Sequence, residues 1–224
     1  MPLLRGTRYP LLGNTGGFLP SKLEGLVMWT RYGSGITITG SGVSQWDDVS
    51  GNGNHLLQGT DAFRPSKEAD GSILFDGTDH RMSASFTLIQ PETVYILGKH
   101  ITWTSGDRWF DGAGANSGTG YMIGVSGDVK LYAGNFQTNP TNIPLDTYGV
   151  MTGVINGASS ALQWENETPE TAGDIGVNNM GGFTLASKAA GTGEGNIQVK
   201  EVLVFNTAHD AATRAQVIAY LQTI

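Results

Sequence analysis

The chain of 224 residues is acidic, with 13 Lys and Arg residues, 20 Asp and Glu residues and a formal net charge of −7 at pH 7. Its basic residues are scattered, so we expect no nucleic-acid partner, because phosphate binding needs clustered cations. The absence of cysteine excludes disulfide frameworks and thiol nucleophiles, and no stretch approaches the roughly 18 apolar residues of a membrane span.

The first 20 residues are interrupted by Pro2, Pro10, Pro20 and several glycines, which favours an extended arm over a helix or a long strand. We expect this arm (1–20) to anchor the protein to a partner through the side chains of Leu3, Leu4, Arg5, Tyr9, Leu11 and Leu12. The start of the chain also lacks the apolar stretch of roughly 7 to 15 residues that a secretory signal contains. We therefore expect the protein to leave the cell by lysis. Residues 21–224 are expected to form one domain.

Short β-type segments with glycine-rich turns between them follow the arm. The chain contains 33 glycines and only 15% charged residues, a composition that suits the turns and bulges of a many-stranded sheet. The predicted strands are 26–29, 36–39, a short strand ending at Trp46, 73–75, 82–87, 93–97, 108–110, 121–125, 129–133, 149–155, 161–164, 183–186 and 197–205. Their spacing predicts an all-β, two-sheet antiparallel jelly-roll sandwich.

The last predicted strand places one acidic residue among apolar residues. By strict alternation, Glu201 shares a face with Ile197, Val199, Leu203 and Phe205. Either a bulge turns Glu201 outward, or its carboxylate is buried and must be paired, because a lone buried charge is very costly. We expect a structural role for Glu201, with Arg64 or Arg81 as its partner.

A short amphipathic helix is predicted to end the chain. Asp210 is placed to cap its N-terminus, and its apolar residues follow the spacing of one helix face. They are Val217, Tyr220, Leu221 and Ile224. We expect this face to pack on an end or edge of the sandwich.

Several motifs recur in an order that is typical of one fold family. They are Trp46, Asp48, Ser50-Gly51-Asn52-Gly53-Asn54-His55 with a tight turn at Asn52-Gly53, Arg64-Pro65, Phe75-Asp76-Gly77-Thr78-Asp79, and Glu201 to Asn206. This order resembles the laminin-G-like, concanavalin A-like jelly roll often found in structural proteins of bacterial viruses and in bacterial surface proteins. The resemblance implies a fold that hosts lectins, glycosidases and purely structural modules.

Catalytic motifs are not evident in the sequence. Laminarinase-like enzymes on this scaffold carry E-x-D-x-x-E on one strand, and this run does not occur. Asp47-Asp48, Asp76-Asp79 and Glu165-Glu167 are acidic pairs in predicted turns or loops. The four histidines do not form a metal-hydrolase motif, and no G-x-S-x-G elbow is present. We therefore expect a protein without enzymatic activity.

Calcium and glycans are the ligands left to consider. Carboxylate and amide oxygens that could bind calcium come from Asp47, Asp48, Asn52, Asn54, Asp76 and Asp79. Asp and Asn also favour tight turns by themselves, so we expect no metal or cofactor and keep calcium as the alternative. For glycans, Trp103 beside Asp107 is the expected stacking platform and Trp164 a second candidate, whereas Trp29, Trp46 and Trp109 are expected in the core.

The resemblance, together with the arm and the missing secretory signal, implies a non-catalytic virion protein of a bacteriophage. We expect an accessory or decoration component, attached by its arm to the capsid, neck or tail, with the sandwich facing outward and homo-oligomers as the assembled form. Receptor-binding tail fibre or spike domains are one alternative, and a carbohydrate-binding lectin-like module that contacts host surface glycans is another. A glycosidase is the least favoured reading, because paired carboxylates are missing.

Overall fold

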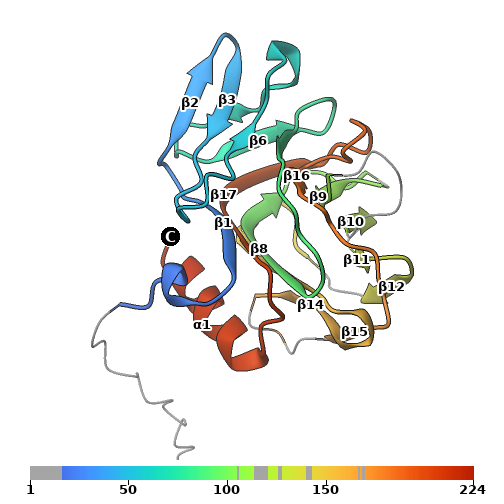
Figure 1. Cartoon of the computed structure of the whole chain (residues 1–224). Coiled ribbons are helices and arrows are strands. Elements are labelled where there is room, and N and C mark those ends of the chain that lie inside the picture. Colours follow the sequence, from blue (N-terminus) through green and yellow to red (C-terminus); the bar gives the residue numbers. More distant parts are fainter. Residues whose placement is uncertain are drawn as a thin grey trace, which may run out of the picture.

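The computed structural model describes residues 17–104, 106–113, 121–125, 128–139, 143–165, 167 and 170–224. These residues form two antiparallel β-sheets packed as a sandwich, with one α-helix near the C-terminus, as predicted (Figure 1). No helix in this part of the chain is long and apolar enough to cross a membrane. The expected anchoring residues lie outside the described residues: Leu3, Leu4, Arg5, Tyr9, Leu11 and Leu12.

The first sheet, sheet A, has eight strands. They are β1 (Leu26–Thr30), β5 (Ser66–Lys67), β6 (Ile73–Asp76), β8 (Glu92–His100), β13 (Gly149–Ile155), β14 (Ser160–Trp164), β15 (Glu170–Gly173) and β17 (Asn196–Phe205). Their order is β15-β14-β13-β8-β17-β6-β5, and β1 also pairs with β17. The long strand β17 therefore has β8 on one side, and β6 followed by β1 on the other.

The second sheet, sheet B, has nine strands in the order β12-β11-β10-β9-β16-β7-β4-β3-β2. They are β2 (Ile36–Thr39), β3 (Gly42–Trp46), β4 (Leu56–Leu57), β7 (Met82–Ala84), β9 (Arg108–Asp111), β10 (Tyr121–Val125), β11 (Asp128–Tyr132), β12 (Phe136–Asn139) and β16 (Phe183–Leu185). Three short 3-10 helices lie in connections: η1 (Pro20–Lys22), η2 (Asp61–Phe63) and η3 (Gly157–Ser159). The sequence did not predict β4, β5, β12 or β15, because they are too short or too polar to show alternation.

The main core lies between the two sheets and is rich in large rings. Trp46 and Trp109 are fully buried there together with Phe75, Phe110 and Phe183. Inward residues alternate with outward ones along the strands, as in β7, where Met82 and Ala84 are buried and Ser83 is exposed. This alternation places the Ser83 side chain on the outer face of sheet B.

A β-bulge changes the faces of β17. Its register with β8 shifts between Val199 and Glu201, so Lys200 is an extra residue. Before the bulge, Ile197 and Val199 face the main core; after it, Leu203 and Phe205 belong to a second apolar cluster. The predicted common face of these residues is therefore wrong, because one inserted residue inverts the alternation.

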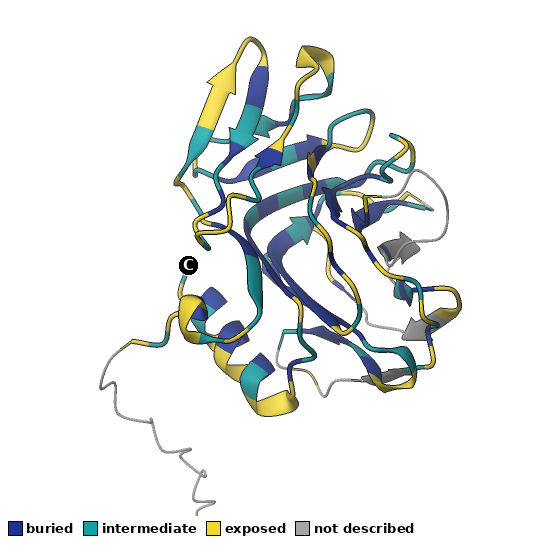
Figure 2. Ribbon diagram, viewed as in Figure 1, coloured by how far each residue is buried: buried dark blue, intermediate teal, exposed yellow. Residues whose placement is uncertain are grey.

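The helix α1 (Ala211–Leu221) covers this second cluster. Its Val217, Ile218 and Leu221 pack with Tyr95, Leu97, Val150, Leu203 and Phe205 of sheet A. Figure 2 shows the helix buried toward the sheet and exposed on its other side. The predicted cap is confirmed, because Asp210 accepts a 2.8 Å hydrogen bond from the Thr213 amide. The helix covers the outer face of sheet A, rather than an end or edge of the sandwich.

Candidate functional site

The Asp48 carboxylate organises the loop between β3 and β4. Its oxygens accept hydrogen bonds from the amides of Trp29 (2.8 Å), Ser50 (2.8 Å) and Asn54 (2.9 Å), and from the Ser50 hydroxyl (2.8 Å). These donors occupy the oxygens that a calcium ion would need. The segment of the predicted tight turn, Asn52-Gly53, lies within a wider loop, because β3 and β4 pair at Trp46 and Leu56, and Gly53 has a positive φ of 74°.

The two asparagines of this loop bind the free side of β1. The Asn52 amide donates to the carbonyls of Leu26 (2.9 Å) and Val27 (3.1 Å), and the Asn54 amide donates to Val27 (2.9 Å). These side chains satisfy carbonyl groups that no neighbouring strand reaches. The Ser-Gly-Asn-Gly-Asn motif therefore fixes the loop between β3 and β4 to β1.

Arg64 is also used for structure. Its guanidinium donates to the Thr39 carbonyl (2.6 Å), the Gln58 and Gly59 carbonyls (3.1 Å each) and the Asp61 carboxylate (2.6 Å). It thereby joins the β2–β3 turn to the segment after β4. Because Arg64 is fully engaged here, it is not the partner of Glu201.

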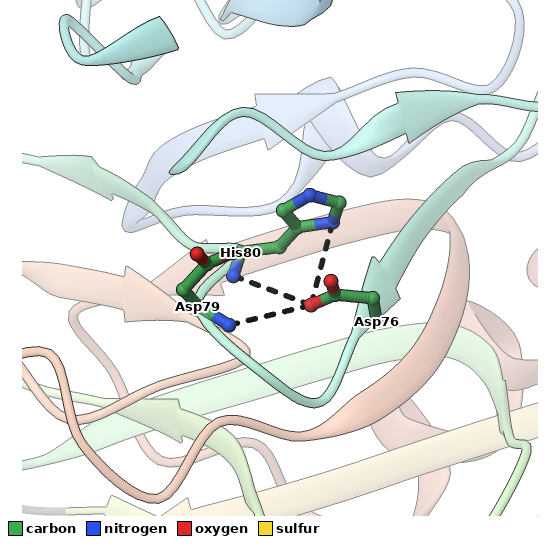
Figure 3. Close-up of side chains that lie close together, drawn as sticks. All are labelled: Asp76, Asp79 and His80. Carbon is green, nitrogen blue, oxygen red and sulfur yellow. Dashed lines mark hydrogen bonds and ion pairs between the residues drawn. The ribbon is translucent and has the colours of Figure 1, made fainter. Parts of the chain in front are cut away.

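The turn after β6 brings together Asp76, Asp79 and His80, whose ligand atoms lie within 4.8 Å of one another (Figure 3). The Asp76 carboxylate accepts from the Thr78 amide (2.9 Å) and more weakly from the amides of Asp79 (3.4 Å) and His80 (3.5 Å). Gly77 adopts a positive φ of 74°, which closes the turn. Hydrogen bonds within the turn therefore stabilise it. Asp48 is not part of this group of side chains.

Glu201 is buried on the helix-covered face, with 1% of its surface exposed. Its carboxylate accepts hydrogen bonds from the Trp29 indole (2.7 Å), the Tyr220 hydroxyl (3.0 Å) and the Tyr32 amide (3.2 Å). Burial raises its pKa, and these donors oppose the shift. Of the two alternatives left open by the sequence, a bulge is present, and yet the carboxylate is buried and hydrogen-bonded. The proposed Arg64 or Arg81 partner is wrong, because both bonding side chains are aromatic.

The residues proposed for glycan stacking are largely buried. Trp164 is a core residue with 5% exposure, so it offers no open platform. Asp107 is buried, accepts a 2.9 Å hydrogen bond from the Thr104 amide and lies 3.3 Å from the His100 imidazole. Trp103 is half-buried and stacks on His100 with a centroid distance of 3.8 Å. Burial lowers the pKa of His100 to about 4, so the imidazole that stacks on Trp103 is neutral at pH 7.

A hollow of about 210 Å³ lies on the outer face of sheet B. Its lining residues are Gln58, Arg81, Ser83, Ala84, Ser85, Ala113, Thr184 and Ala189. Ser83 and Ser85 are exposed, and within the described residues no hydrogen bond occupies their hydroxyls. The buried Thr184 hydroxyl donates to the Gly112 carbonyl (3.0 Å) and keeps its acceptor capacity. The hollow therefore offers unused hydroxyls on small side chains.

Strand alternation explains this composition. Arg81, Ser83 and Ser85 occupy alternate positions along one extended segment, so they share the outward face, while Met82 and Ala84 enter the core. Thr184 of β16 pairs with Ser83 of β7 in the register of the sheet. Sequence reasoning missed this group, because serine and threonine on separate strands form no local motif.

A second, more open hollow lies where α1 begins. It has a volume of about 240 Å³ and is lined by Leu23, Glu24, Thr207, Ala208, His209, Asp210 and Thr213. Its helix terminus is already capped by the Asp210 carboxylate, which satisfies the amide that an anion would otherwise bind. We therefore treat the hollow on sheet B as the candidate site.

No protein-family model matches the sequence, and no curated protein is significantly similar to it. Among solved structures, domain 4 of AbnA, a GH43 extracellular arabinanase from Geobacillus stearothermophilus in complex with arabinotriose, is similar with a TM-score of 0.64 at 11% identity. The match covers 87% of this chain and 98% of that one.

Two larger proteins contain a similar unit. Trypanosoma rangeli sialidase in complex with sialic acid matches with a TM-score of 0.61 at 11% identity, over 90% of this chain and 33% of that one. A botulinum neurotoxin type C structure, from work on its interaction with two ganglioside molecules, matches with a TM-score of 0.61 at 10% identity, over 89% and 52% of the two chains. The chain thus spans about a third of the sialidase chain. At these identities the likeness establishes the fold alone, which is a two-sheet antiparallel β-sandwich.

Proposed function

We propose that the chain is a non-catalytic carbohydrate-binding module whose ligand lies in the hollow on sheet B. The observation that carries this proposal is the pair of exposed hydroxyls at Ser83 and Ser85, beside Thr184, which have no hydrogen-bond partner in the part of the chain that the structure describes. Sugar recognition uses such donors and acceptors, which match the hydroxyl groups of a pyranose or furanose ring. Two structures with the same fold were determined with, or named for, a glycan ligand, which supports this choice.

Binding without cleavage is favoured by the composition of the hollow. The described residues that line it include no Asp or Glu, whereas glycoside hydrolysis typically uses two carboxylates about 5 to 9.5 Å apart. Its volume of about 210 Å³ is also below the range of roughly 300 to 1,000 Å³ for clefts that enclose a drug-sized ligand. We expect one or two sugar units in the hollow, with the rest of the glycan exposed.

The experiment is an NMR titration of the full chain with a panel of oligosaccharides that includes arabinotriose and sialyllactose. We expect the amide signals of Ser83, Ser85 and Thr184 to shift on binding. A Ser83→Trp variant should lose this binding, because the indole fills the hollow. Gln216→Trp, on the exposed side of α1, is the matched control and should bind like the wild type. Shifts confined to another surface, or no binding by any glycan, would refute the proposal.

Attachment to a virion is a separate proposal that rests on the N-terminal arm (1–20). None of the three structures named above is a virion protein, so this role depends on the sequence resemblance and on the arm. Deletion of residues 1–16 tests it: incorporation into phage particles should be lost, while glycan affinity should persist because the sandwich is left intact. Retained incorporation would exclude the arm as the anchor.

A further inference from the structure

We infer that the hollow selects glycans that carry a carboxylate, and that Arg81 recognises this group. The inference rests on the proposed function above and names the ligand class of the same site. Arg81 is half-buried and lines the hollow at the start of the segment that also presents Ser83 and Ser85.

The Arg81 guanidinium is held between two surfaces. Its Cζ lies 4.0 Å from the centroid of the Phe63 ring, a stacking contact that arginine favours. On another side is Gly191, where an added Cβ would lie 2.9 Å from Cζ. The backbone of Arg81 is fixed as well, since its amide donates to the Phe63 carbonyl (3.1 Å) and its carbonyl accepts from Gln58 (2.8 Å). A side chain fixed in this way loses little entropy when it binds.

Among the described residues, the Arg81 guanidinium donates one hydrogen bond. Its Nη1 donates to the backbone carbonyl of Asp79 (3.1 Å). Among the described residues, no carboxylate forms an ion pair with Arg81, in contrast to the 2.6 Å pair of Arg64 with Asp61. The planar fork of a guanidinium matches a carboxylate in a bidentate manner. A stacked and unpaired arginine in a polar hollow is therefore a ready receptor for an anionic group.

The hydroxyls of Ser83, Ser85 and Thr184 are the groups that would form hydrogen bonds with the sugar ring. Along an extended segment, Arg81 and Ser85 are about 13 Å apart, so hydroxyl recognition and carboxylate recognition occupy different ends. Asp111 lies opposite Thr184 in the sheet, but it is not among the lining residues and its carboxylate accepts from the Gly112 amide (2.8 Å). The chain has a net charge of −7, which by itself disfavours an acidic ligand. Arg81, which forms no ion pair with any described residue, supplies the positive charge that can bind one here.

The experiment measures affinities for matched acidic and neutral ligands by calorimetry at constant ionic strength, since salt screens such contacts. One pair is sialyllactose and lactose; the other is trigalacturonic acid and its methyl ester. We expect the acid in at least one pair to bind roughly tenfold or more tightly than its neutral partner. Arg81→Gln should remove this preference, and Arg81→Lys should restore only part of it, because an ammonium group lacks the fork. Lys67→Gln removes an exposed positive charge elsewhere and should change nothing.

The outcomes separate this inference from the proposed function. Equal affinity for acids and neutral partners, unchanged by Arg81→Gln but abolished by Ser83→Trp, would overturn the selectivity and leave the carbohydrate-binding function standing. Failure of every glycan to bind would overturn both. The pair that responds also identifies the source of the carboxylate, as a sialic acid or a uronic acid.

Discussion

The two outer faces of the sandwich are built from similar strands but differ in what covers them. On sheet A, α1 buries Tyr95, Leu203 and Phe205, and the polar groups beneath it, such as Glu201, are hydrogen-bonded within the protein. On sheet B, Ser83 and Leu57 stay exposed, and the serine hydroxyls have no partner in the described part of the chain. Polar groups on the covered face therefore serve stability, whereas those on the open face are available to a ligand.

The largest effect is expected on the covered face, at Glu201. Glu201→Ala removes the acceptor of the Trp29 indole, the Tyr220 hydroxyl and the Tyr32 amide. One buried donor and two half-buried donors then lose their acceptor, so we expect a loss of about 3 kcal/mol in the free energy of unfolding. Urea denaturation measures it, and Glu167→Ala, at an exposed loop position, is the control. A loss below about 1 kcal/mol would contradict the assigned role.

A second buried carboxylate sharpens the comparison, because it has fewer donors. Glu92 is fully buried, and one of its carboxylate oxygens accepts a 3.2 Å hydrogen bond from the Met180 amide. Within the described residues, its other oxygen has no hydrogen-bond partner. Burial raises the pKa of Glu92 to about 7 from an ordinary value of 4.5. The folded state therefore holds its proton more tightly than the unfolded state, and stability falls as pH rises from about 4.5 to about 7.

The variant Glu92→Gln removes this titration. We expect it to unfold like the wild type near pH 4.5 and to be more stable at pH 8, by up to about 3 kcal/mol, since one pKa unit corresponds to roughly 1.4 kcal/mol. Denaturation curves of both proteins at the two pH values provide the test. An equal difference between them at both pH values would show that Glu92 does not titrate in this range.

Asp48 follows β3 of sheet B and binds the Trp29 amide of β1 in sheet A. Its replacement is expected to change stability less than that of Glu201. In Asp48→Asn, one carboxylate oxygen becomes an NH₂ group that must face the amides of Trp29 and Ser50 or that of Asn54. We expect a loss of about 1 to 3 kcal/mol in stability, with Asp47→Asn as the neighbouring control. Calcium should not raise the melting temperature of the wild type. A clear rise that Asp48→Asn abolishes would favour the metal interpretation of this loop instead.

The smallest effect on stability is expected on the open face. Ser83→Ala removes an exposed hydroxyl that has no partner among the described residues, so the free energy of unfolding should change by no more than about 0.5 kcal/mol. Its glycan affinity, measured by calorimetry, should nevertheless fall. A loss of stability with unchanged glycan affinity would contradict the assignment of Ser83 to ligand binding and would give it a structural role instead.

The sequence alone determined the sandwich, most of its long strands and the capped helix. A short, mostly apolar run indicates a buried strand, as in β13, whose predicted range was correct and whose residues are all buried. The recognised motifs also act locally: Asp48, Arg64 and Asp76 bind backbone groups close to them or on the adjacent strand. Such contacts stabilise the backbone of the fold, and this is why the motifs indicated the fold and not the ligand.

Tertiary structure alone decided which polar groups meet. The bulge at Lys200 sends Glu201 toward Trp29 and Tyr220, a result that strict alternation cannot give because one extra residue inverts every later side chain. The candidate site likewise joins Gln58, Arg81 and Thr184, which belong to segments far apart in the chain. Only the pairing of β4, β7 and β16 brings them to one surface, and strand pairing over such separations leaves no periodic pattern in the sequence.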